Sequence, residues 1–395
     1  MKIYLVGGAV RDQLLGREVT DRDYVVVGST PEELLELGYR RVGSKFPVFL
    51  HPISADEHAL ARTEVSTGDR YEDFECYFGK DVTLEQDLGR RDLTINAMAM
   101  VDDKIFDPFN GYADIKHKIL RHVSDAFVED PLRVLRIYRL WAQLGPEWTI
   151  APDTLKLVEQ LVAEGLSLTG ERVWKEMEKA LKSNNPELFF KCGYFEEYNA
   201  LWGVPQNPVH HPEGCVGTHT DLCIQQAVGN PLVVFATLCH DFGKPITHIE
   251  RGNAIGHENA GIKPINDFCL KHKVPTKYRN LALLVAEQHT KVHSCIGRGA
   301  NQALRGKTLL KLLTAAGAFR PGSHFEEFLL ACESDANGRG FKVDYPQVGF
   351  LRDCRAAIIG LDMGEILRYT HPSKVKETVY RAQLSALSRV KEVWL

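Results

Sequence analysis

The chain has 395 residues, of which 44% are hydrophobic and 25% are charged, and its formal net charge is -4. This balance is typical of a globular protein with two or three domains, and no apolar stretch approaches the roughly 20 residues that a membrane helix needs. The small negative charge does not indicate a nucleic-acid binder, so any basic surface must be local. Nine cysteines without a C-x-x-C motif argue against a zinc ribbon or a disulfide framework. The chain starts without a signal pattern, and we expect it to be cytoplasmic.

The first region mixes short β-branched runs with short helical patterns, which predicts an α/β or α+β domain. The runs are Ile3–Val6, Tyr24–Val27 and Pro47–Leu50. In YLVGGAVRDQLLG the first run leads into a Gly-Gly turn and a short helix ended by Gly16. Glycines let backbone N–H groups approach an anion, and a helix N-terminus favours phosphate. Gly8 and Arg11 therefore form either a phosphate site or a plain turn with a surface arginine.

Two acidic residues, Asp21 and Asp23, stand one residue apart at the entrance to the second run. Side chains alternate across a strand, so both carboxylates point to the same face. One interpretation is a pair of solvated charges, partnered by Arg22. The glycine turn earlier in the chain favours another, because paired carboxylates beside a triphosphate supply the oxygen ligands that two Mg²⁺ ions require for phosphoryl transfer.

The second region, residues 116–204, is helical in pattern. Three amphipathic stretches are bounded by Gly, Pro and Asn: DPLRVLRIYRLWAQLG, DTLKLVEQLVAEG and GERVWKEMEKALKS. We expect an all-helical connector.

The first of these stretches carries a stripe of arginines. Asp130 before Pro131 has the form of an N-cap followed by proline at the first helical position. No acidic residue occurs from 131 to 146, and Arg133, Arg136 and Arg139 recur every three residues. Arginine presents fixed donors suited to base edges and phosphates, so the stripe with Asp130 at its head can offer a base both an acceptor and donors. Helix capping alone is the alternative.

The third region is helical and rich in histidine. VVFATLCHDFGKP predicts an apolar helix that ends in His240-Asp241. A single buried His-Asp pair would be a satisfied core hydrogen bond, but this pair belongs to an ordered set. The set is His219, His240, Asp241, His257, His289 and Asp335. Imidazole with carboxylate suits Mn²⁺, Ni²⁺, Co²⁺ or Zn²⁺, and such a centre generates a nucleophilic water.

The ordered motifs together resemble a known family. GGAVRD, DRD, RRDLTINAMA at 90–99, EDPLRVLR at 129–136 and ERVWKE at 171–176, followed by the histidine set, are similar to the bacterial CCA-adding enzymes, the tRNA nucleotidyltransferases, in their long form with an HD phosphohydrolase domain. The resemblance runs through nearly the whole chain. It implies an α+β fold with a polymerase-β-like head over 1–115, a helical neck over 116–204, and an HD domain with C-terminal helices over 205–395.

The resemblance also implies the activity: addition and repair of the 3′-terminal CCA of tRNA from CTP and ATP, without a nucleic-acid template. Asp21 and Asp23 would be catalytic and hold Mg²⁺, and Asp130 with Arg133 would read the base edge. The other nucleotide-binding residues would be Gly8, Arg11, Arg91, Arg136 and Arg139, while Asp92 and Asn96 would orient the loop and the sheet. Glu64 is either an extra carboxylate or a surface partner of Arg62.

For the HD domain the resemblance implies 2′,3′-cyclic phosphodiesterase, 2′-nucleotidase and phosphatase activity with Ni²⁺ or another divalent transition metal. The strongest metal-ligand candidates are His219, His240, Asp241 and Asp335. His257 and His289 would complete a second metal position or bind phosphate, and Lys244 would neutralise substrate charge. The expected partners are tRNA, CTP and ATP, with no DNA and no membrane, and the protein is a monomer or a homodimer. FEEYNALWGVPQ departs from the family by lacking a Pro-Glu before its hydrophobic turn.

Three other classes of protein compete with this assignment. A poly(A) polymerase that adds only A would share the head motifs but carry a strongly basic C-terminal region in place of the histidines. A standalone metal phosphohydrolase leaves the first 200 residues unexplained. A non-catalytic RNA-binding module would not need Asp21 and Asp23 to be acidic.

Overall fold

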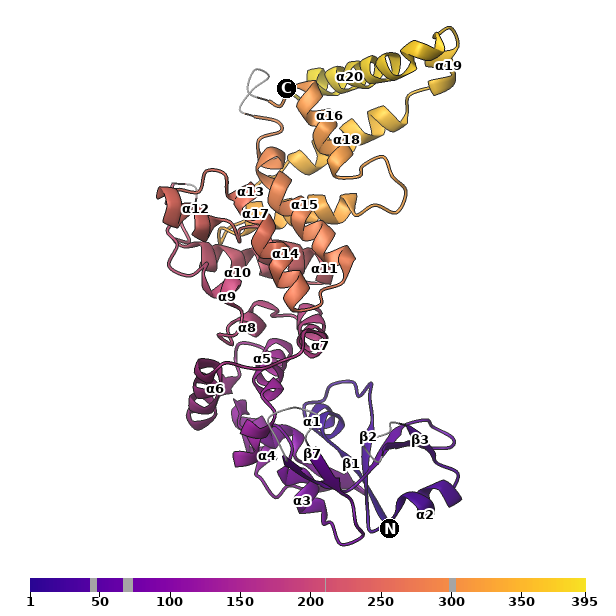
Figure 1. The fold of residues 1–395 in the computed structure, drawn as a ribbon, viewed down its shortest axis with the longest axis vertical. Coiled ribbons are helices and arrows are strands. Elements are labelled where there is room, and N and C mark those ends of the chain that lie inside the picture. Colours follow the sequence, from indigo (N-terminus) through magenta and orange to yellow (C-terminus); the bar gives the residue numbers. More distant parts are fainter. Residues whose placement is uncertain (43–47, 67–73, 210, 298–302) are drawn as a thin grey trace. The chain divides into compact units, whose positions relative to one another are not determined.

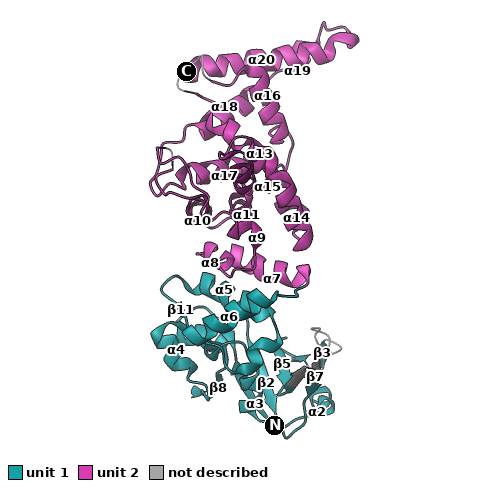
Figure 2. Cartoon of the chain, turned by 60° about the vertical axis from the view of Figure 1, so that its left-hand side comes forward, with its two compact units in different colours: residues 1–168 teal, residues 169–395 magenta. Residues whose placement is uncertain are grey.

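The computed structural model describes residues 1–42, 48–66, 74–209, 211–297 and 303–395. Its contacts divide the chain into two compact units, residues 1–168 and 169–395 (Figure 2). The first unit contains the sheet and the second is helical (Figure 1), so the predicted α+β class is confirmed. The boundary at 168 falls within the stretch predicted as a neck, and the division into head, neck and HD domain stays a prediction. None of the helices described has the length and apolar character to cross a membrane.

Unit 1 is built on a seven-stranded sheet in its described part, with strand order β3-β4-β5-β2-β1-β8-β9. Its strands are β1 (Lys2–Val6), β2 (Asp23–Val27), β3 (Arg40–Val42), β4 (Val48–Leu50), β5 (Glu57–Leu60), β8 (Ala99–Val101) and β9 (Lys104–Phe106). β2 runs parallel to β5, and the other neighbours are antiparallel. The first two predicted runs are confirmed as β1 and β2; Pro47 of the third lies outside the described residues.

Smaller elements complete unit 1. They are the hairpin β6 (Thr63–Ser66) and β7 (Phe74–Tyr77), the pair β10 (Ile119–Leu120) and β11 (Thr149–Ile150), and the helices α1 (Gly8–Leu14), α2 (Pro31–Glu36), α3 (Leu84–Gly89), α4 (Gly111–His117), α5 (Leu132–Leu144) and α6 (Pro152–Glu164). The short helix predicted before Gly16 is α1, and the first two predicted amphipathic stretches are α5 and α6.

β2 is buried on both faces of the sheet. Val25 packs in one apolar cluster with Val6 and Leu88, whereas Val26 packs in another with Leu34 and Phe49. Consecutive side chains of a strand point to opposite faces, so one strand joins two cores. Burial on both sides holds the strand in register and thereby fixes the backbone of the acidic residue at its start.

Unit 2 contains the third predicted stretch, as α7 (Gly170–Leu181), followed by the remaining helices. These are α8 (Glu187–Phe190), α9 (Glu196–Asn199), α10 (Val216–Gln226), α11 (Pro231–Cys239), α12 (Lys244–Arg251), α13 (His257–Ala260), α14 (Ile262–Lys271), α15 (Thr276–His293), α16 (Gly306–Ala315), α17 (Phe325–Asn337), α18 (Gln347–Ile359), α19 (Met363–Leu367) and α20 (Val375–Trp394). α10, α11, α15 and α17 pack against one another. The predicted apolar helix is α11, and His240-Asp241 follows it directly.

Candidate active sites

The strand register of unit 1 brings the acidic pair to the glycine turn. Val6, the last residue of β1, pairs with Asp23, the first residue of β2. Gly7 and Gly8 follow Val6 directly, so the turn and the acidic pair lie at the same edge of the sheet. On the other side of β2, Asp23 pairs with Glu57.

Two arginines lie against the glycine turn. A Cβ added to Gly7 would lie 3.0 Å from Nη1 of Arg91, and one added to Gly8 would lie 3.4 Å from Nη2 of Arg11. Gly7 also has a φ of 71°, in the region that favours glycine. A side chain at position 7 would therefore crowd the guanidinium of Arg91, whereas one at position 8 would make an ordinary contact with that of Arg11.

Carboxylates and an amide hold these guanidinium groups in place. Asp87, fully buried, accepts a hydrogen bond from Nη2 of Arg91 at 3.2 Å. Arg11 forms a two-pronged pair with Asp12 and donates to Oδ1 of Asn96 at 2.7 Å. Asp87 is a site residue that the sequence analysis missed, although the spacing in DLGRRD places it one helical turn before both Arg90 and Arg91.

Asp21 and Asp23 are both exposed. Neighbouring protein removes part of the hydration of Asp23, and together with the like charge of Asp21 this raises the pKa of its carboxyl, while Arg91 lowers it in part. Two carboxylates that repel each other on an open edge form a site suited to a divalent cation. The side chain of Glu64, in β6, lies outside the described part of the chain.

The arginines of α5 make contacts within unit 1. Arg133 is buried, and its Nη1 and Nη2 donate to the backbone carbonyls of Ala126 and Arg90, both at 2.6 Å. Arg139 is buried and donates to Oε1 of Gln143 at 2.8 Å. Asp130 accepts a hydrogen bond from the backbone N–H of Leu132 at 3.1 Å. The helix itself begins at Leu132 with Pro131 as its N-cap, one residue later than predicted.

Arg136 links α5 to the glycine turn through a chain of polar contacts. It binds Oδ2 of Asp92 through Nε at 2.8 Å and Nη2 at 2.7 Å. Oδ1 of Asp92 accepts from Nδ2 of Asn96 at 3.1 Å, and Asn96 in turn accepts from Arg11. Burial opposes ionisation of Asp92, but Arg136 and the hydrogen bonds outweigh it and hold the pKa of this carboxyl well below its usual range.

In unit 2 the histidines and carboxylates gather into three groups of possible metal ligands among the described residues. One of them joins His211 and Glu213 to His219, and the other two adjoin each other. His219, Cys223, His240 and Asp335 form the first, and Asp241, His257 and His289 form the second; within each group the ligand atoms lie within 4.8 Å of one another. Oδ2 of Asp241 is 3.1 Å from Nε2 of His240, so this doublet joins the two groups. All seven side chains are buried.

Backbone carbonyls determine which ring nitrogen of each of the four histidines is left to bind a metal. A carbonyl oxygen can only accept a hydrogen bond, so the ring nitrogen that faces a carbonyl carries a proton, and whenever the ring is neutral the other nitrogen has the lone pair. In every case Nδ1 faces a carbonyl, and Nε2 is the nitrogen free to bind a metal. The pairs are His219–Gly338 at 3.0 Å, His240–Thr237 at 2.6 Å, His257–Ala254 at 2.7 Å and His289–Val285 at 2.9 Å.

These Nε2 atoms face other acceptors at short distance. Nε2 of His257 lies 3.2 Å from Nε2 of His289. Nε2 of His219 lies 3.0 Å from Oδ1 of Asp335. Burial lowers the pKa of His289 to about 3, so its ring is neutral near pH 7. Contacts between lone pairs repel unless a proton or a cation lies between them, and the arrangement therefore suits a bound cation.

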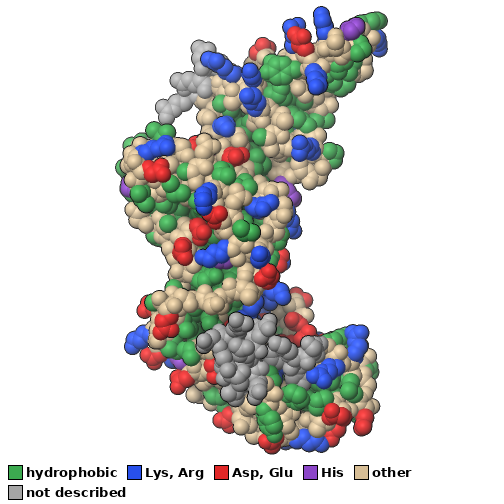
Figure 3. Space-filling view, viewed as in Figure 1, with side chains coloured by type: hydrophobic (Ala, Val, Ile, Leu, Met, Phe, Trp, Pro, Cys, Tyr) green, Lys and Arg blue, Asp and Glu red, His purple; other side chains and the backbone are tan. Residues whose placement is uncertain are grey.

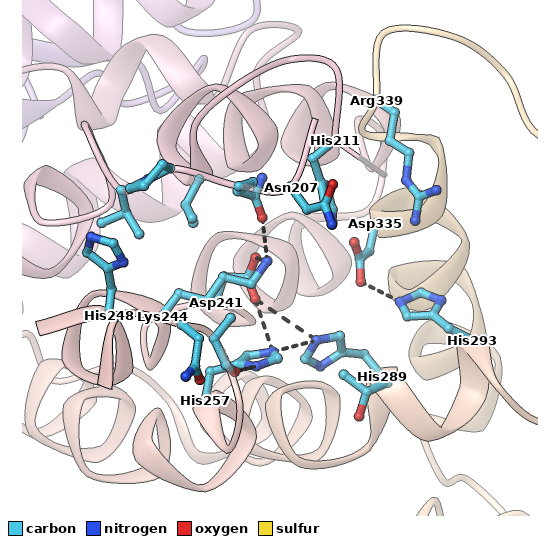
Figure 4. Close-up of a pocket in the computed structure, with 18 residues that line it drawn as sticks. Asn207, His211, Asp241, Lys244, His248, His257, His289, His293, Asp335 and Arg339 are labelled. Carbon is cyan, nitrogen blue, oxygen red and sulfur yellow. Dashed lines mark hydrogen bonds and ion pairs between the residues drawn. The ribbon is translucent and has the colours of Figure 1, made fainter. Parts of the chain in front are cut away.

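The second group faces a cavity of about 650 Å³. Figure 4 shows Asp241, His257 and His289 directed toward one another, with Asp335 paired to His293. Lys244 lines the same cavity and lies 2.6 Å from Asp241. Burial disfavours the charge on Asp241, but His240 and Lys244 outweigh it and hold the pKa of this carboxyl well below its usual range.

Two further residues of this centre were missed by the sequence analysis. Nε2 of His293 lies 2.7 Å from Oδ2 of Asp335. Oε1 of Glu213 lies 2.7 Å from Nδ1 of His219. His293 follows His289 by four residues on α15, a spacing that puts both on one helix face and could have identified it. Glu213 lies in the sequence HPEGC, which has no helical spacing that could have identified it.

Comparisons with known proteins agree with this architecture. A model of the Poly A polymerase head domain matches residues 3–121. The multifunctional CCA protein of Hahella chejuensis is 45% identical over 99% of this chain and 96% of its own length. The multifunctional CCA protein of Actinobacillus pleuropneumoniae is 44% identical, over 99% of each chain.

Solved structures share the fold. The Bacillus stearothermophilus CCA-adding enzyme in complex with CTP has a TM-score of 0.62 at 22% identity, covering 98% of this chain and 89% of that one. A CCA-adding enzyme with ATP has a TM-score of 0.64 at 19% identity, covering 98% and 85%. The identity to full-length relatives shows that the chain belongs to the family of multifunctional CCA proteins.

Proposed function

We propose that this chain adds and repairs the 3′-terminal CCA of tRNA using CTP and ATP, without a nucleic-acid template, and that unit 2 carries a metal-dependent HD phosphohydrolase. Family membership supports the first activity. The observation that carries it is the register of β1 and β2, which sets an acidic pair beside a glycine turn with two arginines. The observation that supports the second activity is that four buried histidines face backbone carbonyls through Nδ1, which leaves Nε2 of each ring for a metal.

In the head, Arg11 and Arg91 bind the triphosphate beside the backbone of the glycine turn, Gly8 included. Asp21 and Asp23 hold Mg²⁺, which supplies charge neutralisation for attack of the tRNA 3′-hydroxyl on the α-phosphate, with pyrophosphate as the leaving group. The raised pKa of Asp23 fits this role, because a divalent ion offsets both the lost hydration of this carboxylate and its repulsion by Asp21.

The base is selected at α5 in this proposal. Asp130 supplies an acceptor and Arg133 supplies donors for the edge of the incoming C or A, while Arg136 and Arg139 hold the nucleotide. Arg136 is tied through Asp92 and Asn96 to Arg11, so α5 and the triphosphate site share one polar chain. Because Arg133 already donates to two carbonyls, reading a base requires it to exchange or share those hydrogen bonds.

In unit 2, His219, His240, Asp241 and Asp335 hold Ni²⁺ or another divalent transition metal, with His257 and His289 at a second position. Such an ion supplies a nucleophilic water at neutral pH. Lys244 and Arg339 line the same cavity and neutralise a phosphate ester. We propose 2′,3′-cyclic phosphates, 2′-nucleotides and other phosphate monoesters as substrates.

A basic surface for tRNA lies at the C-terminal end of unit 2. Figure 3 shows Lys and Arg side chains gathered over α16 and α20. Lys307 and Lys311 line a cavity of about 770 Å³ there, together with Tyr380. Local positive charge of this kind binds the phosphate backbone although the whole chain is slightly acidic.

One assay separates the nucleotidyl-transfer candidates. The protein is incubated with Mg²⁺, tRNA lacking its last three nucleotides, and labelled CTP or ATP, singly and together. We expect CTP alone to extend the tRNA, ATP alone not to, and both to complete it. A-only addition identifies a poly(A) polymerase, and no addition leaves a standalone phosphohydrolase or an RNA-binding module. Hydrolysis of 2′,3′-cyclic nucleotides with added Ni²⁺, measured on the same preparation, tests unit 2.

A further inference from the structure

We infer that Cys223 is a sulfur ligand of the metal centre in unit 2, and that its thiolate makes the first ligand group selective for zinc-like ions over manganese or magnesium. The inference rests on the proposed HD metal centre and adds a ligand of another chemical class to it. Soft thiolate ligands favour zinc, whereas carboxylate and water sites suit magnesium and manganese.

The spacing of the four atoms fits a single ion. His219 and Cys223 lie one turn apart on the same face of α10, and Sγ is 3.4 Å from Nε2 of His219. Oδ1 of Asp335 is 3.0 Å from that nitrogen and 3.8 Å from Nε2 of His240. A tetrahedral ion with bonds of about 2.0–2.3 Å holds its ligand atoms roughly 3.3–3.8 Å apart, so the observed spacings need only small adjustments.

Burial and charge also fit a bound ion. His219 and Cys223 are each 0% exposed, His240 is 1% exposed and Asp335 is 5% exposed. Nε2 of His240 belongs to this group and lies 3.1 Å from Oδ2 of Asp241 and 3.8 Å from Oδ1 of Asp335. Binding of a divalent ion displaces the proton of the thiol and any proton on the Nε2 atoms, and the resulting thiolate, carboxylate and two neutral imidazoles cancel the charge of the ion, which removes the large cost of a net buried charge.

The absence of a side chain at Gly338 leaves space for the sulfur of Cys223. A Cβ on Gly338, just after α17, would lie 2.2 Å from Sγ of Cys223. The same glycine supplies the carbonyl that accepts from Nδ1 of His219. Among the described residues, no other cysteine belongs to a group that could hold a metal. Cys223 is therefore set apart from the remaining buried cysteines by position as well as by its neighbours.

The test looks for sulfur bound to the metal. The full chain is loaded with Co²⁺ for near-ultraviolet absorption and with Zn²⁺ for X-ray absorption. We expect a thiolate-to-cobalt charge-transfer band and one zinc–sulfur distance of about 2.3 Å. Cys223→Ser should lose both signals and bind Zn²⁺ at least about tenfold more weakly, with a smaller change for Mn²⁺. Cys354→Ala, at a buried cysteine in α18, should keep both signals.

The outcomes distinguish this inference from the proposal beneath it. Metal bound in unit 2 of the wild-type chain through nitrogen and oxygen alone overturns the role of Cys223 and leaves the HD centre intact. Metal content that does not fall in His240→Ala overturns the HD centre itself. The wild-type spectra decide the first question even if Cys223→Ser fails to fold, and the head carboxylates contribute no sulfur signal.

Discussion

The position of Asp23 in the sheet determines which residues lie beside its carboxylate. It begins β2 between Val6 of β1 and Glu57 of β5. The like charge of Asp21 and the guanidinium of Arg91 act on the same carboxylate in opposite directions. An amide in its place keeps the shape but removes the charge that a divalent cation requires.

Asp21→Asn or Asp23→Asn should therefore reduce addition of C and A by about 100-fold or more, since charge stabilisation of a phosphoryl transfer is lost. Incorporation of labelled CTP and ATP into tRNA measures the effect. Hydrolysis of 2′,3′-cyclic nucleotides on the same preparation is the control and should be unchanged. Near-normal addition by either variant would contradict the assignment of the catalytic pair.

His272 is a buried histidine outside the groups of possible metal ligands. It is 1% exposed, packs on Phe268 at a ring distance of 4.6 Å, and neither ring nitrogen hydrogen-bonds within the described residues. Burial lowers the pKa of His272 to about 4, below the value of about 6.5 in an unfolded chain. Protonation thus favours the unfolded state, and stability is lost as the pH falls from about 6.5 toward 4.

His272→Phe should remove this pH dependence. Its free energy of unfolding should exceed that of wild type by an amount that grows as the pH falls, by up to about 3 kcal/mol near pH 4. Denaturant unfolding at several pH values measures the difference. Two curves that stay parallel between pH 7 and pH 4 would show that His272 does not titrate on unfolding.

At the scale of elements, α5 combines a structural and a proposed selective role. Nη1 and Nη2 of Arg133 satisfy two backbone carbonyls, so truncating it leaves those carbonyls without these bonds. Arg133→Ala should lower the free energy of unfolding of unit 1 by about 1–3 kcal/mol. If the side chain also reads the base, the variant should discriminate less among the four triphosphates.

The measurement compares incorporation of CTP, ATP, UTP and GTP by the folded variant. Arg136→Ala serves as the matched control, because it removes a neighbouring arginine that lies over Asp92 and not at the proposed base edge. We expect UTP and GTP to gain relative to CTP in Arg133→Ala but not in Arg136→Ala. An equal loss for all four nucleotides in Arg133→Ala would support the capping interpretation.

Helices with a strong hydrophobic period could be predicted from the sequence, whereas contacts between elements distant in the sequence could not. The periods in residues 130–183 predicted α5, α6 and α7 within one or two residues at each end. Asp87 has partners three and four residues away, so local spacing could have identified it. Glu213 contacts His219, and no helical period links these two residues. Cys223 follows His219 by four residues, but its meaning appears only when α17 brings Asp335 and Gly338 to it. The shared face predicted for Asp21 and Asp23 rested on strand alternation, but β2 begins at Asp23 and Asp21 precedes it, so the shared face stays a prediction. Only the register shows that Val6, and with it the glycine turn, lies beside Asp23.

At the scale of the whole molecule, each compact unit carries its own candidate site. The head residues lie within 1–168 and the two histidine groups within 169–395. Asp241→Ala should abolish cyclic-phosphate hydrolysis and its stimulation by Ni²⁺ or Mn²⁺, because the residue joins the two ligand groups. The same variant should still extend tRNA with CTP, ATP and Mg²⁺.

Asp23→Asn should show the reverse pattern, which makes the two variants controls for each other. Bound metal measured on both preparations should fall only in Asp241→Ala when the added ion is Ni²⁺ or Zn²⁺. Loss of tRNA extension by Asp241→Ala would show that the sites are coupled, and retained hydrolysis would reduce His240-Asp241 to a structural pair.

Nε2 of His257 and Nε2 of His289 lie close enough to hold a cation between them, so the stability of unit 2 should depend on the concentration of the metal ion. An ion that binds only the folded state stabilises it in proportion to the logarithm of its concentration, by about 2.7 kcal/mol at 100 times its Kd. Chelation should therefore lower the melting temperature of unit 2 and leave that of unit 1 unchanged in scanning calorimetry, and graded Zn²⁺ or Ni²⁺ should restore it. A metal-poor cell would then hold this protein with an intact head and a helical half exposed to proteolysis, so both phosphate-ester hydrolysis and the tRNA surface proposed at α16 and α20 would be lost through turnover.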